Sequence, residues 1–123
     1  MYFIKNKPIY IQIAHDIVVK ILSKEIKPAT LLPSVRELSV TYNVTPKTIQ
    51  SVTKYLDEYS IITRKPGVGS VITNDIEKVK ELHYKHGLKN TIEYTKYMES
   101  LHYSRQDIMS YLEDAFKGGK HND

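Results

Sequence analysis

Apolar residues recur at helical spacing near the start of the chain. Four isoleucines are spaced four residues apart, at Ile9, Ile13, Ile17 and Ile21. Two further apolar residues, Ala14 and Leu22, stand beside them. The residues between them are polar, namely Gln12, His15, Asp16 and Lys20. This spacing gives a helix one apolar face, and Pro8 is suited to the first turn because its missing N–H costs nothing there. We expect a helix from residue 8 to about residue 24, with the isoleucines buried and His15 on the polar side.

A second, shorter helix is predicted after an apolar connection, residues 31–33, which we expect to tuck under the domain. Ser34 and Glu37 have the spacing of a capping box, in which each side chain bonds the backbone N–H of the other residue. The helix should end near residue 42. Its inward-facing residues should be Val35, Leu38 and Val40.

A third helix should follow a tight turn at residues 43–44, where Asn tolerates left-handed backbone angles. Thr45 is a suitable cap, and Pro46 fits the first helical position. The expected buried stripe is Ile49, Val52 and Leu56, which leaves a polar and cationic face made of Lys47, Thr48, Gln50, Ser51 and Lys54. That face has no acid before Asp57, so its chemistry suits a DNA major groove.

After residue 60 the spacing of apolar residues changes from that of a helix to the alternation of strands. Residues 61–65 and 70–73 alternate as short strands around the turn 66–69, whose glycines supply backbone freedom. Two strands alone are marginally stable, so the hairpin should pack on the helices. Two short helices joined by a tight turn and followed by a hairpin are typical of a winged helix-turn-helix.

The last part of the chain is predicted to be helical again. Ile76, Val79 and Leu82 repeat at intervals of three, and Ser104 with Asp107 caps a final helix. Gly87 costs a helix about 1 kcal/mol relative to Ala, so the pattern leaves open whether one helix runs through it. The predicted fold class is mainly α with a small β-hairpin: a winged helix-turn-helix followed by a two-helix C-terminal dimerisation element.

Charge divides the chain into the same two parts. The chain has 123 residues and a net charge of +4; residues 1–75 carry ten Lys/Arg against six Asp/Glu, and residues 76–123 carry eight of each. A basic part beside a neutral one favours nucleic acid as the partner of the first and protein as the partner of the second. We expect a DNA-binding domain at 1–75 and a helical dimerisation tail at 76–123.

Several other classes find little support. Without cysteine there is no disulfide, thiolate metal site or thiol catalysis. No signal peptide or apolar run of about 20 residues is present, so we expect a cytoplasmic protein without membrane contact. No nucleophile triad, phosphate loop or paired-carboxylate motif indicates an enzyme, and we expect no cofactor. His83, His86 and His102 leave a metal site as a minor alternative to ordinary surface histidines.

Four segments together resemble the GntR family of bacterial repressors, in order and at the family's spacing. They are Pro8-Ile9-Tyr10-x-Gln12-Ile13, Leu32-Pro33-Ser34-Val35-Arg36-Glu37-Leu38, Val44-Thr45-Pro46-Lys47-Thr48-Ile49 and Gly67-x-Gly69. The start of the third helix and the short C-terminal part resemble the YtrA-type subfamily. The resemblance implies a dimer formed by a two-helix tail and, often, control of operons for ABC transporters.

The resemblance also implies that Arg36 faces DNA, either at a phosphate or bidentately at a guanine; a surface ion pair is the alternative. Many relatives have arginines where this chain has Pro46 and Gln50, and this difference weakens any transfer of a relative's operator sequence to this chain. A glycine is usual where Ala29 stands. The full set of expected DNA-binding residues is Ser34, Arg36, Thr45, Lys47, Thr48, Gln50, Ser51, Lys54, Arg64, Lys65, Gly67 and Gly69.

The expected function is a sequence-specific DNA-binding transcription regulator, a repressor that binds an inverted-repeat operator as a homodimer. The expected dimer contacts are Ile92, Tyr97, Met98, Leu101, Ile108, Leu112 and Phe116. The alternative for some of them is packing of the last helix within one chain. An unidentified small-molecule effector stays open as a partner. The alternative is a winged-helix protein-interaction module that does not bind specific DNA.

Overall fold

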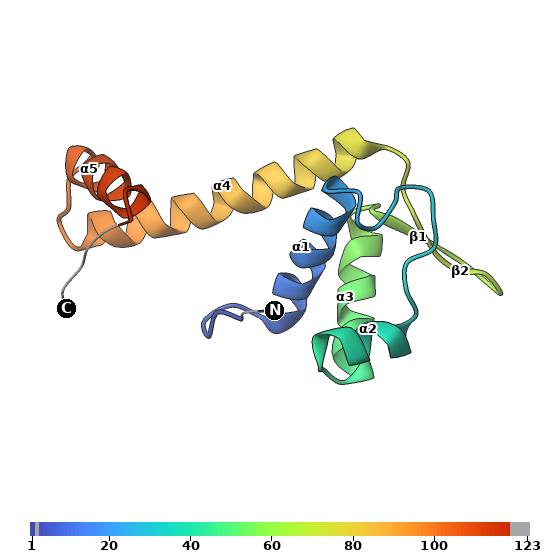
Figure 1. Ribbon diagram of the computed structural model, residues 1–123. Coiled ribbons are helices and arrows are strands. Elements are labelled where there is room, and N and C mark those ends of the chain that lie inside the picture. The colour runs from blue at the N-terminus through green and yellow to red at the C-terminus, as the bar shows by residue number, and fades with distance from the viewer. Residues whose placement is uncertain (2, 119–123) are drawn as a thin grey trace. The chain divides into compact units, whose positions relative to one another are not determined.

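The computed structural model describes residues 1 and 3–118, which form two compact units, Met1–Tyr84 and the part from Lys85 onward. The fold is mainly helical with one antiparallel two-stranded hairpin, as predicted (Figure 1). The elements are α1 (Ile9–Leu22), α2 (Val35–Tyr42), α3 (Pro46–Glu58), β1 (Ile62–Lys65), β2 (Gly69–Ile72), α4 (Ile76–Ser100) and α5 (Arg105–Phe116).

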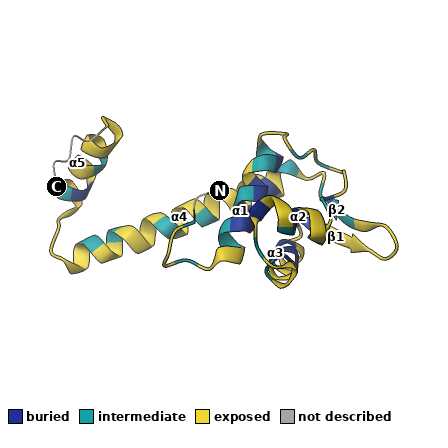
Figure 2. Ribbon diagram, turned by 60° about the horizontal axis from the view of Figure 1, so that its bottom comes forward, coloured by how far each residue is buried: buried dark blue, intermediate teal, exposed yellow. Residues whose placement is uncertain are grey.

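The core of the first unit lies where α1 and α2 pack on α3. Its largest fully buried side chains include those of the predicted stripes of α1 and α3, namely Ile13, Ile17, Ile21, Ile49, Val52 and Leu56. Buried residues are dark blue on the ribbon of Figure 2. Two predictions for α1 were wrong. Ile9, in the first turn, is exposed, and His15 is buried because Tyr55 of α3 covers it, with 2.7 Å between His15 Nε2 and the Tyr55 hydroxyl.

The start of α2 has the predicted capping box. The Glu37 amide donates to Ser34 Oγ, and the Ser34 amide donates to Glu37 Oε1, both at 3.1 Å. The helix ends at Asn43, whose left-handed φ of 53° begins the turn to α3. Val40 is 79% exposed and not inward-facing as predicted, because Leu38 and Tyr42 lie on the opposite side of this helix and fill the core.

Tyr42 connects α2 to α1. Its hydroxyl donates to Asp16 Oδ2 at 2.7 Å and accepts from Lys20 Nζ at 3.2 Å. Burial, and then the hydrogen bond to the Asp16 carboxylate, raise the pKa of the Tyr42 phenol far above its ordinary value. The phenol therefore stays protonated and keeps α2 in place against α1.

The hairpin pairs Ile62 with Ile72 and Lys65 with Gly69, and its buried end packs on the helical core. The connection before α2 adds backbone hydrogen bonds to β2: Leu32 N donates to Ser70 O and Ile72 N donates to Thr30 O, both at 2.8 Å. This segment runs like a short extra strand, so neighbouring side chains point to opposite sides. Leu32 is buried as expected, whereas Leu31 is 53% exposed.

Helix α4 runs without interruption through Gly87, which settles the point that the sequence left open. Its first turns belong to the first unit, where Val79 and Leu82 join the core. The predicted Ser104 capping box begins α5, and Ile108 is the buried residue of that helix. In the described part of the chain, no helix is both long enough and apolar enough to span a membrane.

Candidate DNA interface

Helix α3 presents a polar face on the side away from the core. Ile49, Val52, Thr53 and Leu56 are buried, whereas Lys47, Gln50, Ser51 and Lys54 are exposed. The structure thus brings four of the predicted DNA-binding residues together on one face. In a helix-turn-helix, the second helix of the pair enters the major groove, and we refer to α3 as the recognition helix.

Thr45 and Thr48 bond to each other at the start of the recognition helix. The Thr48 amide donates to Thr45 Oγ1 at 3.3 Å, and the two hydroxyls are 3.2 Å apart. Thr45 is therefore the helix cap, as its position in the sequence indicated. DNA contact by these two residues stays a prediction.

Arg36 projects from the first turn of α2 into solvent. Among the described residues it takes part in no ion pair, so the surface-pair alternative is not what the structure shows. Ser34, next to it, caps α2. The guanidinium is free to reach a phosphate or a base edge.

The hairpin, which we call the wing (residues 62–72), requires glycines at its tip. Gly67 and Gly69 have φ angles of 75° and 125°, which side-chain-bearing residues rarely adopt. Val68 N donates to Lys65 O at 2.9 Å and closes the turn. Lys65 is exposed and, in the part of the chain that the structure describes, forms no ion pair, so its ammonium group is available to contact a phosphate.

Arg64 lies differently from its neighbour Lys65. Its Nη2 donates to Thr53 Oγ1 of the recognition helix at 3.1 Å, and its Nε is 4.0 Å from Asp57 Oδ2. The prediction treated both cations alike, as DNA-facing groups. The structure turns the Arg64 guanidinium toward α3 and leaves the side chain 53% exposed, so DNA contact by Arg64 stays a prediction.

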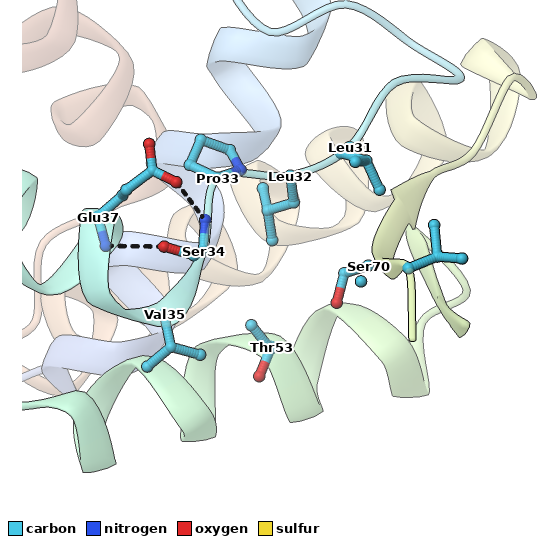
Figure 3. A pocket seen from close by; sticks show the side chains of 10 residues that line it. Leu31, Leu32, Pro33, Ser34, Val35, Glu37, Thr53 and Ser70 are labelled. Carbon is cyan, nitrogen blue, oxygen red and sulfur yellow. Dashed lines mark hydrogen bonds between the residues drawn. The ribbon is translucent and has the colours of Figure 1, made fainter. Parts of the chain in front are cut away.

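A cleft separates the start of α2 from the wing (Figure 3). Ser34 and Val35 of α2, Thr53 of α3 and Ser70 of β2 line it, together with the connection 31–33. A neighbouring hollow, lined by Gln50, Lys54 and Arg64 among others, shares Val35, Thr53 and Ser70 with it. Thr53 and Ser70 were not among the residues predicted from the sequence; the available signal was a threonine inside the otherwise apolar stripe of α3.

The histidines considered as metal ligands do not form a cluster. Among the described residues, no three side chains of His, Cys, Asp or Glu are placed to hold a metal ion. His86 is hydrogen-bonded to Asn90, one turn along α4. The metal alternative gains no support from the structure.

The predicted dimer residues divide into two groups. Ile108 is buried and Met98 and Leu112 are half-buried within their own chain, whereas Ile92, Tyr97, Leu101 and Phe116 are exposed. Phe116 is 85% exposed. Tyr103 and Tyr111 pack edge to face, with ring centroids 5.6 Å apart.

A helix-turn-helix whose second helix exposes a cationic face, followed by a hairpin wing, defines a winged-helix DNA-binding protein. Residues 9–72 match the model of the bacterial regulatory proteins of the gntR family. The chain belongs to the GntR family, and it is a DNA-binding transcription regulator of that family.

Relatives resemble the chain over nearly its whole length. It is 32% identical over 117 residues to the uncharacterised HTH-type transcriptional regulator YhcF of Bacillus subtilis, with 95% of this chain and 97% of YhcF covered. It is also 32% identical over 126 residues to the HTH-type transcriptional repressor YtrA of the same organism, covering 96% and 94%. A GntR regulator from Listeria monocytogenes has a similar structure, with a TM-score of 0.75, 30% identity and coverage of 91% and 98%. These findings confirm the resemblance to GntR and YtrA-type regulators.

Proposed function

We propose that the protein is a transcriptional repressor that binds an inverted-repeat operator as a homodimer. The observation that carries the proposal is the pairing of an exposed recognition face with a tail that leaves large apolar side chains uncovered. One winged helix contacts a short stretch of DNA. A symmetric dimer that reads two half-sites multiplies those contacts.

Two features of the second unit support self-association. Tyr97 of α4, Leu101 just after that helix, and Met109 and Phe116 of α5 are each at least half exposed. Apolar side chains in such numbers mark a protein interaction site on a soluble domain. A second copy of the same tail is the partner that the charge balance favours, since this part of the sequence has as many basic as acidic residues.

The sign of control is inferred from a relative. YtrA of Bacillus subtilis is a transcriptional repressor, and the chain matches it over nearly the whole length of both proteins. Repression follows when a bound dimer occupies promoter DNA. A promoter-reporter fusion tests the inference: expression should rise when the gene for this protein is deleted and fall when it is restored, whereas the opposite response would make the protein an activator.

Operator binding is tested directly on the DNA upstream of the protein's own gene. The purified protein should bind this DNA in the nanomolar range, against competitor DNA, with an affinity that falls steeply as salt rises. Arg36→Ala and Lys47→Ala should each weaken binding; a lost base contact costs about 1–3 kcal/mol, and a lost phosphate contact lowers the salt slope by about 1. Lys89→Ala removes the same charge from the tail and should bind like the wild type.

The same measurement separates the alternatives. A folded dimer that shows no preference for its own upstream region over random DNA would contradict the proposed operator and favour the protein-interaction module. Equal weakening by Lys89→Ala and Lys47→Ala would mean that net charge, not the recognition face, drives binding.

A further inference from the structure

The wing is a narrow ribbon that depends on contacts beside it. Only its first pair, Ile62 and Ile72, is buried, and the rest of β1 is exposed. An isolated two-stranded hairpin is at best marginally stable. The direction in which the wing projects therefore depends on what each strand contacts beyond the buried pair.

The connection before α2 supports β2. Leu31 forms a bridge with Val71, and Leu32 N bonds Ser70 O. A side chain at Gly69 would touch Leu31 Cδ2, which shows how closely the connection lies against this strand. β1, on the other edge, lacks this support.

Arg64 supplies the corresponding contact for β1. Its guanidinium donates to Thr53 Oγ1 at 3.1 Å, and Thr53 Oγ1 itself donates to the Gln50 carbonyl at 3.0 Å. The Thr53 hydroxyl therefore donates its hydrogen within α3 and accepts a hydrogen bond from Arg64. The donor and the acceptor capacity of this hydroxyl are thus both used. Thr53 is buried, which fixes the position of the acceptor.

Asp57 lies one turn further along α3, with its Oδ2 4.0 Å from Arg64 Nε. A nearby carboxylate makes a guanidinium less attractive to phosphate, because part of its charge is already balanced. Lys65, the adjacent wing residue, has no such acid beside it among the described ion pairs. The two neighbouring cations are therefore suited to different tasks.

We propose that Arg64 is a positioning residue that holds the wing against the recognition helix through Thr53, while Lys65 provides the phosphate contact. The Arg64–Thr53 contact fixes the spacing between the two DNA-binding elements. The proposal rests on operator binding, but the contact itself exists in the protein without DNA and can be measured there.

Four variants separate positioning from direct contact. Thr53→Val removes the hydroxyl but no charge, and it should weaken operator binding roughly tenfold, as Arg64→Ala does. Neither should change the slope of log affinity against log salt. Lys65→Ala should lower that slope by about 1. Thr53→Ser keeps the hydroxyl and should bind like the wild type.

A double-mutant cycle gives the sharpest result. Thr53→Val combined with Arg64→Ala should bind no more weakly than Arg64→Ala alone, since both changes remove one interaction. A lower salt slope for Arg64→Ala, with Thr53→Val unaffected, would overturn the proposal and make Arg64 a phosphate contact. Wild-type affinity in both single variants would also overturn it.

Hydrogen exchange on the DNA-free protein keeps the test independent of the operator. Hydrogen-bonded amides of the wing, such as those of Val68 and Ile72, should exchange faster in Thr53→Val and Arg64→Ala than in the wild type and Lys65→Ala. Unchanged exchange would contradict the positioning role. If the wild type binds no operator but the variants show the expected exchange pattern, the proposed function is wrong, whereas the Arg64–Thr53 contact still positions the wing.

Discussion

Ala29 occupies a backbone position whose left-handed angle favours glycine. Its φ is 64°, in the left-handed region, and its amide donates to Ile72 O at 3.0 Å, so the connection must adopt this angle to reach β2. Left-handed angles cost an L-residue roughly 1–2 kcal/mol. The family's usual glycine at this point therefore has a physical reason.

We expect Ala29→Gly to stabilise the protein. Relief of the left-handed strain exceeds the extra entropy that glycine loses on folding, and the free energy of unfolding should rise by up to about 1 kcal/mol. Ala29→Val, which places a branched Cβ at the same angle, should lower it by more than about 1 kcal/mol. Urea denaturation of the three proteins measures both changes; a less stable glycine variant would show that the left-handed angle carries no strain.

At the scale of elements, α4 contains a glycine that its own chain does not explain. A Cβ at Gly87 would meet nothing within 4 Å, and the helix continues through it. Glycine inside a helix is less favourable than alanine by about 1 kcal/mol. Packing within the described chain does not require the missing side chain.

Gly87→Ala should therefore raise thermal stability. The expected gain is about 1 kcal/mol, a few degrees in melting temperature for a domain of this size. Circular dichroism during heating measures it, and Lys89→Gly in the same helix serves as the reverse control, with a loss of similar size. If Gly87→Ala weakened dimerisation while helicity rose, a partner's backbone would have to approach at this point.

At the scale of the whole molecule, the tail should determine the oligomeric state. Leu101→Asp and Phe116→Asp each place a charge at an exposed apolar position in the second unit. Burying an unpaired charge between two copies is costly, so both variants should elute as monomers of about 14.3 kDa, with the wild type at twice that mass.

Light scattering after size exclusion checks the prediction, with Ser110→Asp on α5 as the matched control that stays dimeric. The monomeric variants should keep the melting behaviour of the first unit but lose most of their operator affinity, since one half-site offers fewer contacts. A dimeric Phe116→Asp protein would place the interface elsewhere.

Much of the fold follows from local pattern. The capping boxes at Ser34 and Ser104, the Asn43 turn, the proline that begins α3 and the glycine turn of the wing were all predictable, because each depends on residues within a few positions of one another. The exposed face of α3 followed from helical period alone. These local features were also sufficient to indicate the family, which the comparisons confirm.

What the sequence could not determine depends on contacts between distant segments. His15 is buried because Tyr55, forty positions away, covers it, and Val40 is exposed because other side chains fill the core beneath α2. The turning of Arg64 toward Thr53, away from its neighbour Lys65, depends in the same way on how the wing packs against α3. Periodicity assigns a residue to a face of its own element, but only tertiary packing decides what covers that face, because burial and hydrogen bonding depend on the partner as much as on the residue.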